Sequence, residues 1–132
     1  MKMTRRLEKI FQYYNNKYNL NAKLEFTNYL ADSYFEIETN KISILVPLPG
    51  QYSLNKMAIF SILHELKHAI DFYNNKERFL EEIKDYAQND NIYKSDKKYN
   101  FGKRADRFAN YHFKKWSNNL NKLEGSYINI IK

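Results

Sequence analysis

The longest helical pattern in the chain, residues 53–73, constrains the fold more than any other segment. Its apolar side chains recur every three or four residues and form a broad face that has to be buried. Ser53 is the candidate N-cap, and Asn74 closes the pattern. The side chains that we expect on the buried face are Met57, Ile59, Ile62, Leu63, Leu66 and Ile70.

The segments before this helix predict one more helix and a small sheet. Residues 4–17 carry an apolar stripe at helical spacing, with Thr4 as the candidate N-cap. Alternation of apolar and polar residues then predicts three strands. The expected strands are residues 24–28, 34–38 and 41–46. Thr39 and Asn40 form a hairpin turn between the last two, and the two prolines and the glycine of residues 47–50 end the sheet segment.

After the long helix, the pattern predicts helices at residues 76–89 and 102–120, separated by a polar loop at 89–100. The tail at residues 126–131 is a candidate edge strand. We therefore expect an α+β fold, in which a small antiparallel β-meander packs with the long helix and the other helices. A length of 132 residues suits one domain, residues 1–132.

The composition excludes several classes of protein. There are no cysteines, which excludes a disulfide scaffold, a thiol nucleophile and a cysteine-based zinc site. No apolar stretch approaches the roughly 18 residues of a membrane span. The basic N-terminal segment lacks the continuous apolar run of a signal peptide. We therefore expect a soluble, cytoplasmic protein that does not contact a membrane.

Positive charge is concentrated in one segment. The chain carries a formal net charge of +7, and residues 94–115 hold eight basic and two acidic side chains, a net charge of +6. Such a segment is most often a solvated surface. It is also a candidate contact for an acidic protein or for nucleic acid, although no nucleic-acid-binding motif accompanies it. The candidate partner-binding residues are Lys103, Arg104 and Arg107.

The residues that carry chemistry lie within the long helix. His64, Glu65 and His68 form the pattern H-E-x-x-H. Residues four apart share one face of a helix, so both imidazoles can bind one zinc ion. Glu65 stands beside the first ligand and is the candidate general base for a metal-bound water. The pattern arises by chance in about 0.005 of sequences of this composition, so it is a strong indication of one bound Zn²⁺.

The surroundings of the motif resemble a known family. A strand ending in Ile-Ser-Ile-Leu-Val-Pro, a short loop and the sequence Ile-Leu-His-Glu-Leu-Lys-His-Ala resemble small zincin-like metallopeptidases of the ImmA/IrrE type, and also the peptidase half of ArdC-like proteins. Residues 105–109, Ala-Asp-Arg-Phe-Ala, resemble a downstream signature of that family. The resemblance implies a zincin fold, a phage or mobile-element origin and a protein substrate such as a host or phage regulator. It also implies that the strand before the helix lines the substrate cleft as an edge.

The third metal ligand departs from the family pattern. The family places a glutamate shortly before the downstream alanine, where this chain has Gly102, Lys103 and Arg104. Asp106 is the favoured substitute because aspartate is a competent zinc ligand. The alternatives are Asp71, Glu81, Glu82, Asp85 and His112, or no third protein ligand at all. Asp71 is also a candidate for orienting His68.

The leading hypothesis is therefore a zinc-dependent metallopeptidase that hydrolyses peptide bonds with metal-activated water. The absent glutamate and the basic segment motivate an alternative, in which a catalytically degenerate zincin scaffold binds and inhibits or regulates another protein, for example in counter-defence. Nucleic-acid binding through residues 94–115 is the third hypothesis.

Overall fold

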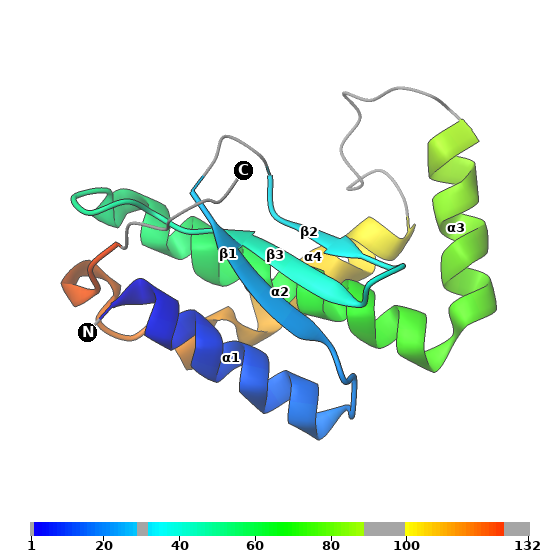
Figure 1. Cartoon of the computed structure of the whole chain (residues 1–132), viewed down its shortest axis with the longest axis horizontal. Coiled ribbons are helices and arrows are strands. Elements are labelled where there is room, and N and C mark those ends of the chain that lie inside the picture. The colour runs from blue at the N-terminus through cyan, green and yellow to red at the C-terminus, as the bar shows by residue number, and fades with distance from the viewer. Residues whose placement is uncertain (1, 29–31, 89–99, 126–132) are drawn as a thin grey trace.

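The computed structural model describes residues 2–28, 32–88 and 100–125 (Figure 1). The fold is α+β, as predicted. Its elements are α1 (Met3–Lys17), β1 (Lys23–Thr27), β2 (Tyr34–Glu36), β3 (Lys41–Leu45), α2 (Asn55–Asn74), α3 (Lys76–Gln88) and α4 (Asn100–Trp116), with the 3-10 helices η1 (Tyr52–Leu54) and η3 (Leu120–Lys122). Within the described ranges, no helix combines the length and the apolar character that crossing a membrane requires.

The predicted ends of the elements differ from the observed ones by a few residues. α2 begins at Asn55 after η1, so Ser53 is not its N-cap. α1 begins at Met3, which places Thr4 inside the helix. α4 ends at Trp116 rather than at residue 120. The expected loop, apart from residue 100, and the expected edge strand at 126–131 lie outside the described residues.

The sheet is mixed, with the strand order β1-β3-β2. β2 and β3 form the expected antiparallel hairpin, with Tyr34 opposite Ser43. β1 runs parallel to β3, so the predicted antiparallel β-meander is wrong. β3 is central in this order, and its Ile42, Ser43 and Ile44 are all buried, so both faces of the strand are covered. The strand before α2 pairs with both neighbours at residues 41–43, so it is not the edge strand that we expected.

α2 lies at the centre of the fold and contacts α1, α3, α4, β2 and β3. The expected core residues Ile59, Ile62, Leu63, Leu66 and Ile70 are all buried. Each stabilises the fold by about 1.5–3 kcal/mol relative to an exposed side chain. Met57 was expected on the same face, but it is 58% exposed because it lies at the rim of an open cavity beside the end of β3.

Small residues allow α4 to approach α2 closely. Gly102, Ala105 and Ala109 recur on α4 at spacings of three and four residues, and all three are buried. Side chains of this size leave room for the ridges of the neighbouring helix. α4 contacts α2 more extensively than any other pair of elements does. This packing holds Asp106, the residue after Ala105, beside the long helix.

A chain of hydrogen bonds joins α1 to α4. Nε1–H of Trp116 donates to Oη of Tyr14 at 3.1 Å, and this oxygen lies 2.9 Å from Nδ1 of His112. All three groups are satisfied when Tyr14 donates its own proton to a neutral His112. Burial, together with the charges of Lys17 and Lys115, lowers the pKa of His112 below its usual 6.5. The neutral imidazole is therefore the form that the fold requires.

We expect acid to weaken the fold through His112. Because its pKa in the folded protein lies below 6.5, the unfolded chain binds the proton more readily. The free energy of unfolding should therefore fall as the pH drops from 6.5 toward the folded pKa, and this contribution is fully present above 6.5. His112→Asn removes the titration but keeps an acceptor for Tyr14. Urea unfolding at a series of pH values should then show that the free energy of unfolding falls less with decreasing pH in the variant than in the wild type. Equal pH dependence in the two proteins would show that His112 is not the cause of the acid destabilisation.

Candidate metal centre

One face of α2 brings together the two histidines and the glutamate of the motif. His64, Glu65 and His68 are buried, with 8%, 8% and 5% of their surfaces exposed. The Nε2 atoms of His64 and His68 lie 3.1 Å apart, and Oε2 of Glu65 lies 4.0 Å from Nε2 of His64. In the part of the chain that the structure describes, this is the one group of three potential ligands, with its donor atoms within 4.8 Å of one another. It could hold a metal ion.

The spacing of the two nitrogens suits one tetrahedral ion. Two nitrogen ligands at about 2.0–2.1 Å from a tetrahedral Zn²⁺ lie about 3.3 Å apart. The observed 3.1 Å is close to this value, so both lone pairs can reach one point with little movement. Imidazole nitrogens and carboxylate oxygens are also donors that zinc accepts. The residues present therefore fit the ion that the motif implies.

Asp106 approaches the other nitrogen of the His64 ring. Its Oδ1 lies 2.8 Å from Nδ1 of His64. An ionised carboxylate only accepts hydrogen bonds, so Nδ1 carries the proton and Nε2 keeps the lone pair that faces His68. We expected Asp106 as the third ligand. In the structure it instead contacts the nitrogen that points away from the ligand position, where it orients the ring.

Aromatic rings surround the two histidines. The ring centroids of Phe79 on α3 and Phe101 on α4 lie 5.9 and 5.4 Å from that of His68. Phe60 lies 6.3 Å from His64 by the same measure. These rings restrict the orientation of the imidazoles and exclude water from their sides. The sequence did not single out the three phenylalanines, because they come from three helices that only the tertiary structure brings together.

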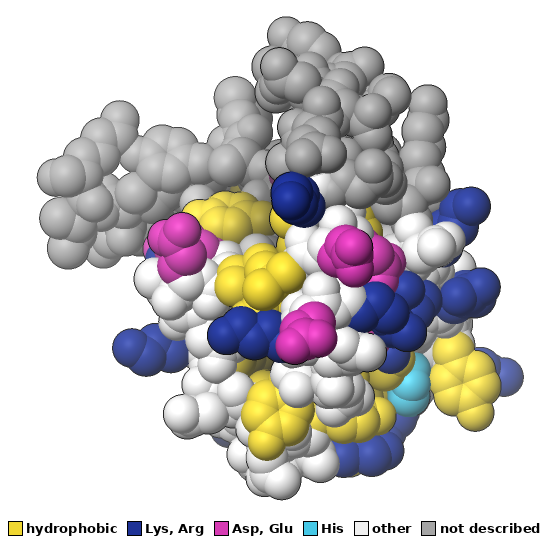
Figure 2. Space-filling view, turned by 90° about the vertical axis from the view of Figure 1, so that its right-hand side faces the viewer, with side chains coloured by type: hydrophobic (Ala, Val, Ile, Leu, Met, Phe, Trp, Pro, Cys, Tyr) yellow, Lys and Arg dark blue, Asp and Glu magenta, His cyan; other side chains and the backbone are white. Residues whose placement is uncertain are grey.

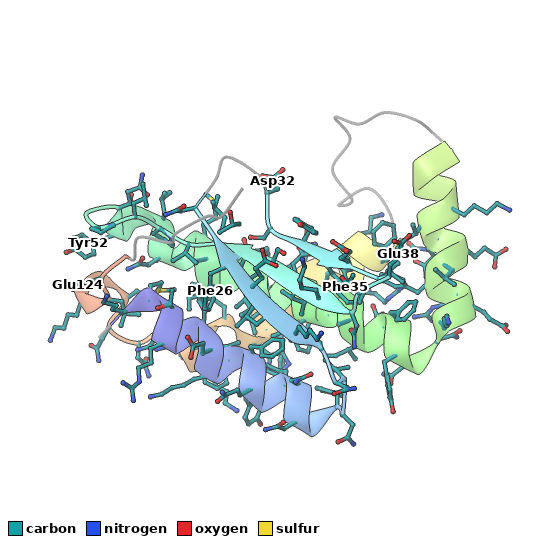
Figure 3. The ribbon with its side chains drawn as sticks, in the orientation of Figure 1. Phe26, Asp32, Phe35, Glu38, Tyr52 and Glu124 are labelled. Carbon is teal, nitrogen blue, oxygen red and sulfur yellow. The ribbon has the colours of Figure 1, made fainter. Side chains whose placement is uncertain are left out.

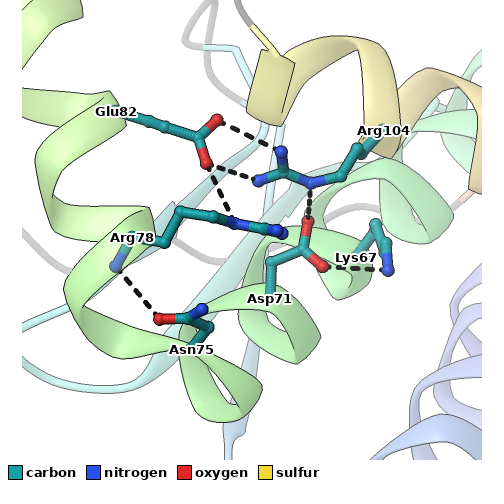
Figure 4. Close-up of polar contacts among 6 residues, drawn as sticks. All are labelled: Lys67, Asp71, Asn75, Arg78, Glu82 and Arg104. Atoms are coloured by element: carbon teal, nitrogen blue, oxygen red, sulfur yellow. Dashed lines mark hydrogen bonds and ion pairs between the residues drawn. The ribbon is translucent and has the colours of Figure 1, made fainter.

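Two of the other predicted ligands belong to a charge cluster that joins α2, α3 and α4 (Figure 4). Nε of Arg104 donates to Asp71 at 2.9 Å, and Nη2 of Arg104 donates to Glu82 at 2.9 Å. Lys67 pairs with Asp71 at 2.9 Å, and Arg78 pairs with Glu82 at 3.4 Å. Burial alone would lower the pKa of Arg104, but its bonds to Glu82 and Asp71 outweigh this effect and raise it. Asp71 and Glu82 are therefore held by cations rather than by the histidines.

The remaining candidate ligands also lie apart from the cluster. Glu81 is exposed on α3. His112 is hydrogen-bonded to Tyr14 through Nδ1. The side chain of Asp85 is outside the described part of the structure. Among the side chains that the structure describes, no further ligand outside the motif is therefore identified beside the two histidines and Glu65.

The candidate partner-binding residues separate into two kinds. Arg104 is turned into the charge cluster, with 18% of its side chain exposed, so it is poorly placed to meet a partner. Lys103 and Arg107 are exposed, and their role stays a prediction. On the face that carries α3, acidic and basic side chains are intermixed rather than gathered by sign (Figure 2). This face does not present a uniform field for nucleic acid.

Replacing Arg104 by methionine should destabilise the fold by roughly 2–4 kcal/mol, because it leaves the buried Asp71 and the partly buried Glu82 without their shared cation. The exposed Lys103, one position earlier on α4, provides a matched control with the same loss of charge. Lys103→Met should change stability by less than about 0.5 kcal/mol. Urea unfolding measures both variants. If both variants lose a similarly small part of the free energy of unfolding, the charge cluster stabilises the fold no more than a surface ion pair does.

Comparisons with protein-family models, with curated proteins and with solved structures give no match for this chain. Any function must therefore be argued from the residues of this chain and from their geometry.

Proposed function

We propose that this protein is a zinc-dependent metallopeptidase in which His64 and His68 hold the metal and Glu65 is the general base. The observation that carries this proposal is the approach of the two Nε2 atoms to 3.1 Å, with the carboxylate of Glu65 beside them. When bound, zinc lowers the pKa of a water molecule to about 7 and polarises the carbonyl oxygen of the peptide bond.

Glu65 moves the proton in this reaction. Its carboxylate takes a proton from the attacking water and then delivers it to the nitrogen of the departing amine. The C–N bond breaks as a new C–O bond gives the carboxyl product. The burial of Glu65 supports this role, because the carboxylate of a residue that is only 8% exposed is weakly screened by bulk water. Asp106 assists indirectly, since its bond to Nδ1 keeps His64 in the ligand tautomer.

We extend the proposal to a zincin-like fold of the ImmA/IrrE type. Its support is the succession of β3, the motif helix α2 and α4, whose Ala105 and Ala109 are buried where α4 packs on α2. On this proposal the substrate is a protein or peptide, such as a host or phage regulator, and the protein acts in the cytoplasm of a cell that carries a phage or mobile element.

Glu65→Gln should lower the kcat/KM for peptide hydrolysis by roughly 10²–10⁴-fold, because the amide cannot accept the proton. Zinc content should stay near one ion per chain, since both histidines remain. The measurements are mass spectrometry of a proteome-derived peptide library and elemental analysis of metal. Glu81→Gln makes the same chemical change at an exposed site on α3 and should leave cleavage unchanged. Wild-type turnover in the Glu65 variant would refute the mechanism.

Asp106→Asn should weaken zinc binding by roughly 10–100-fold, the usual cost of losing a residue that orients a histidine ligand. The absorption spectrum of the Co²⁺-substituted protein should keep its intensity and position, because the number of ligands is unchanged. A spectrum that reports a lower coordination number would instead make Asp106 a ligand. Asp32→Asn, the same change at an exposed residue that lines the cavity beside the end of β3, should alter neither quantity.

The burial of the cluster favours a second candidate, a non-catalytic scaffold that binds a protein partner. Less than a tenth of the surface of each of the three residues is exposed, which restricts the approach of a polypeptide. The exposed Lys103 and Arg107 would then be available for the partner. Full zinc loading, with the wild type and Glu65→Gln equally unable to cleave the peptide library, would favour this candidate.

A further inference from the structure

An open cavity of about 220 Å³ lies between the first turns of α2, the end of β3 and the residue pair that precedes β2. Its volume is below the roughly 300–1,000 Å³ of sites for small molecules, and it suits one large side chain. Leu45 and Val46 from β3 and its end, together with Leu54 and Met57 from η1 and α2, supply apolar walls. The exposure of Met57, at 58%, shows that the cavity opens to solvent.

The cavity lies on the same stripe of α2 as the metal cluster. Ser61, which lines it, precedes His64 by three residues and Glu65 by four. Residues at these spacings are neighbours on one helix face. Four residues correspond to a rise of about 6 Å along the axis, and an extended peptide advances about 3.3 Å per residue. A side chain in the cavity would therefore belong to a residue within about two positions of the bond that Glu65 attacks.

The charge at the edge of this cavity is negative, and the carboxylate of Asp32 carries it. Among the described residues that line the cavity, Asp32 is the charged one, and none is a lysine or arginine. Asp32 is exposed just before β2, at the end of that strand farther from α3 (Figure 3). Within the described ranges, no basic side chain forms an ion pair with it. In a chain with a net charge of +7, this is an apolar cavity with an acidic rim.

We infer that the cavity binds a lysine or arginine side chain of the peptide substrate, which makes Asp32 a specificity-determining residue. This inference rests on the proposed peptidase function. The aliphatic stem of such a side chain packs against Leu45, Val46 and Met57 while its cation pairs with Asp32. A purely apolar side chain would cover part of the carboxylate without a partner, and an acidic one would be repelled. The long basic side chain is the occupant that satisfies both the walls and the rim.

The test is a titration followed by methyl NMR, on the full chain carrying Glu65→Gln and without added metal. The probes are acetyl-Ala-Lys-Ala-amide and acetyl-Ala-norleucine-Ala-amide, which differ in the terminal cation. We expect the lysine probe to shift the methyl signals of Leu45, Val46 and Met57 and to bind about three- to tenfold more tightly than the norleucine probe. Asp32→Asn should reduce this preference to within about twofold. Glu38→Gln, the same change at an exposed acid outside the cavity, should preserve it.

Equal affinity for the two probes, an unchanged preference in Asp32→Asn, or no shift of these methyl signals would overturn the inference. The titration requires neither zinc nor cleavage, so it separates the two proposals. If the protein binds the lysine probe but never cleaves a peptide, the proposed role of the cavity stands and the proposed peptidase function fails. If the zinc-loaded wild type cleaves peptides that have no basic residue near the cut bond, the proposed peptidase function stands and the proposed specificity fails.

Discussion

The close packing of α4 against α2 is the interaction on which the rest of the structure depends. Gly102, Ala105 and Ala109 remove the side-chain bulk that would hold the two helices apart. Because the helices meet there, Asp106 reaches Nδ1 of His64 at 2.8 Å. The same contact carries Arg104, two positions before Asp106, to the carboxylate of Asp71. A larger residue in this small-residue stripe would displace both polar contacts together.

The acidic residues near the motif are divided between two tasks. Asp106 fixes the tautomer of His64, so the nitrogen that faces His68 is free of its proton. Asp71 and Glu82 instead neutralise Arg104, which ties α3 to the other two helices. This division leaves Glu65 as the carboxylate closest to the nitrogen pair among the described residues. A base beside two histidine donors is the arrangement that metal-assisted hydrolysis uses.

The candidate metal centre and the cavity near the end of β3 lie on one face of α2. The nitrogen pair, the carboxylate of Glu65 and Ser61, which lines the cavity with the acidic rim, all belong to one stripe of α2. A rigid helix keeps the spacing between a bound side chain and the reacting bond constant. Because β1 pairs along β3 and β2 pairs with residues 41–43, little of the strand before α2 is left for a substrate to pair with, and side-chain recognition at the cavity would contribute more to substrate placement.

Local spacing in the sequence determined the helices, the β2–β3 hairpin and the shared face of His64, Glu65 and His68, because these features depend on residues a few positions apart. Tertiary structure alone decided the parallel pairing of β1, the exposure of Met57 and the place of Asp106. Each of these depends on which distant segment covers a residue. A single sequence shows that an aspartate lies near a histidine's helix, but only packing decides which nitrogen it meets.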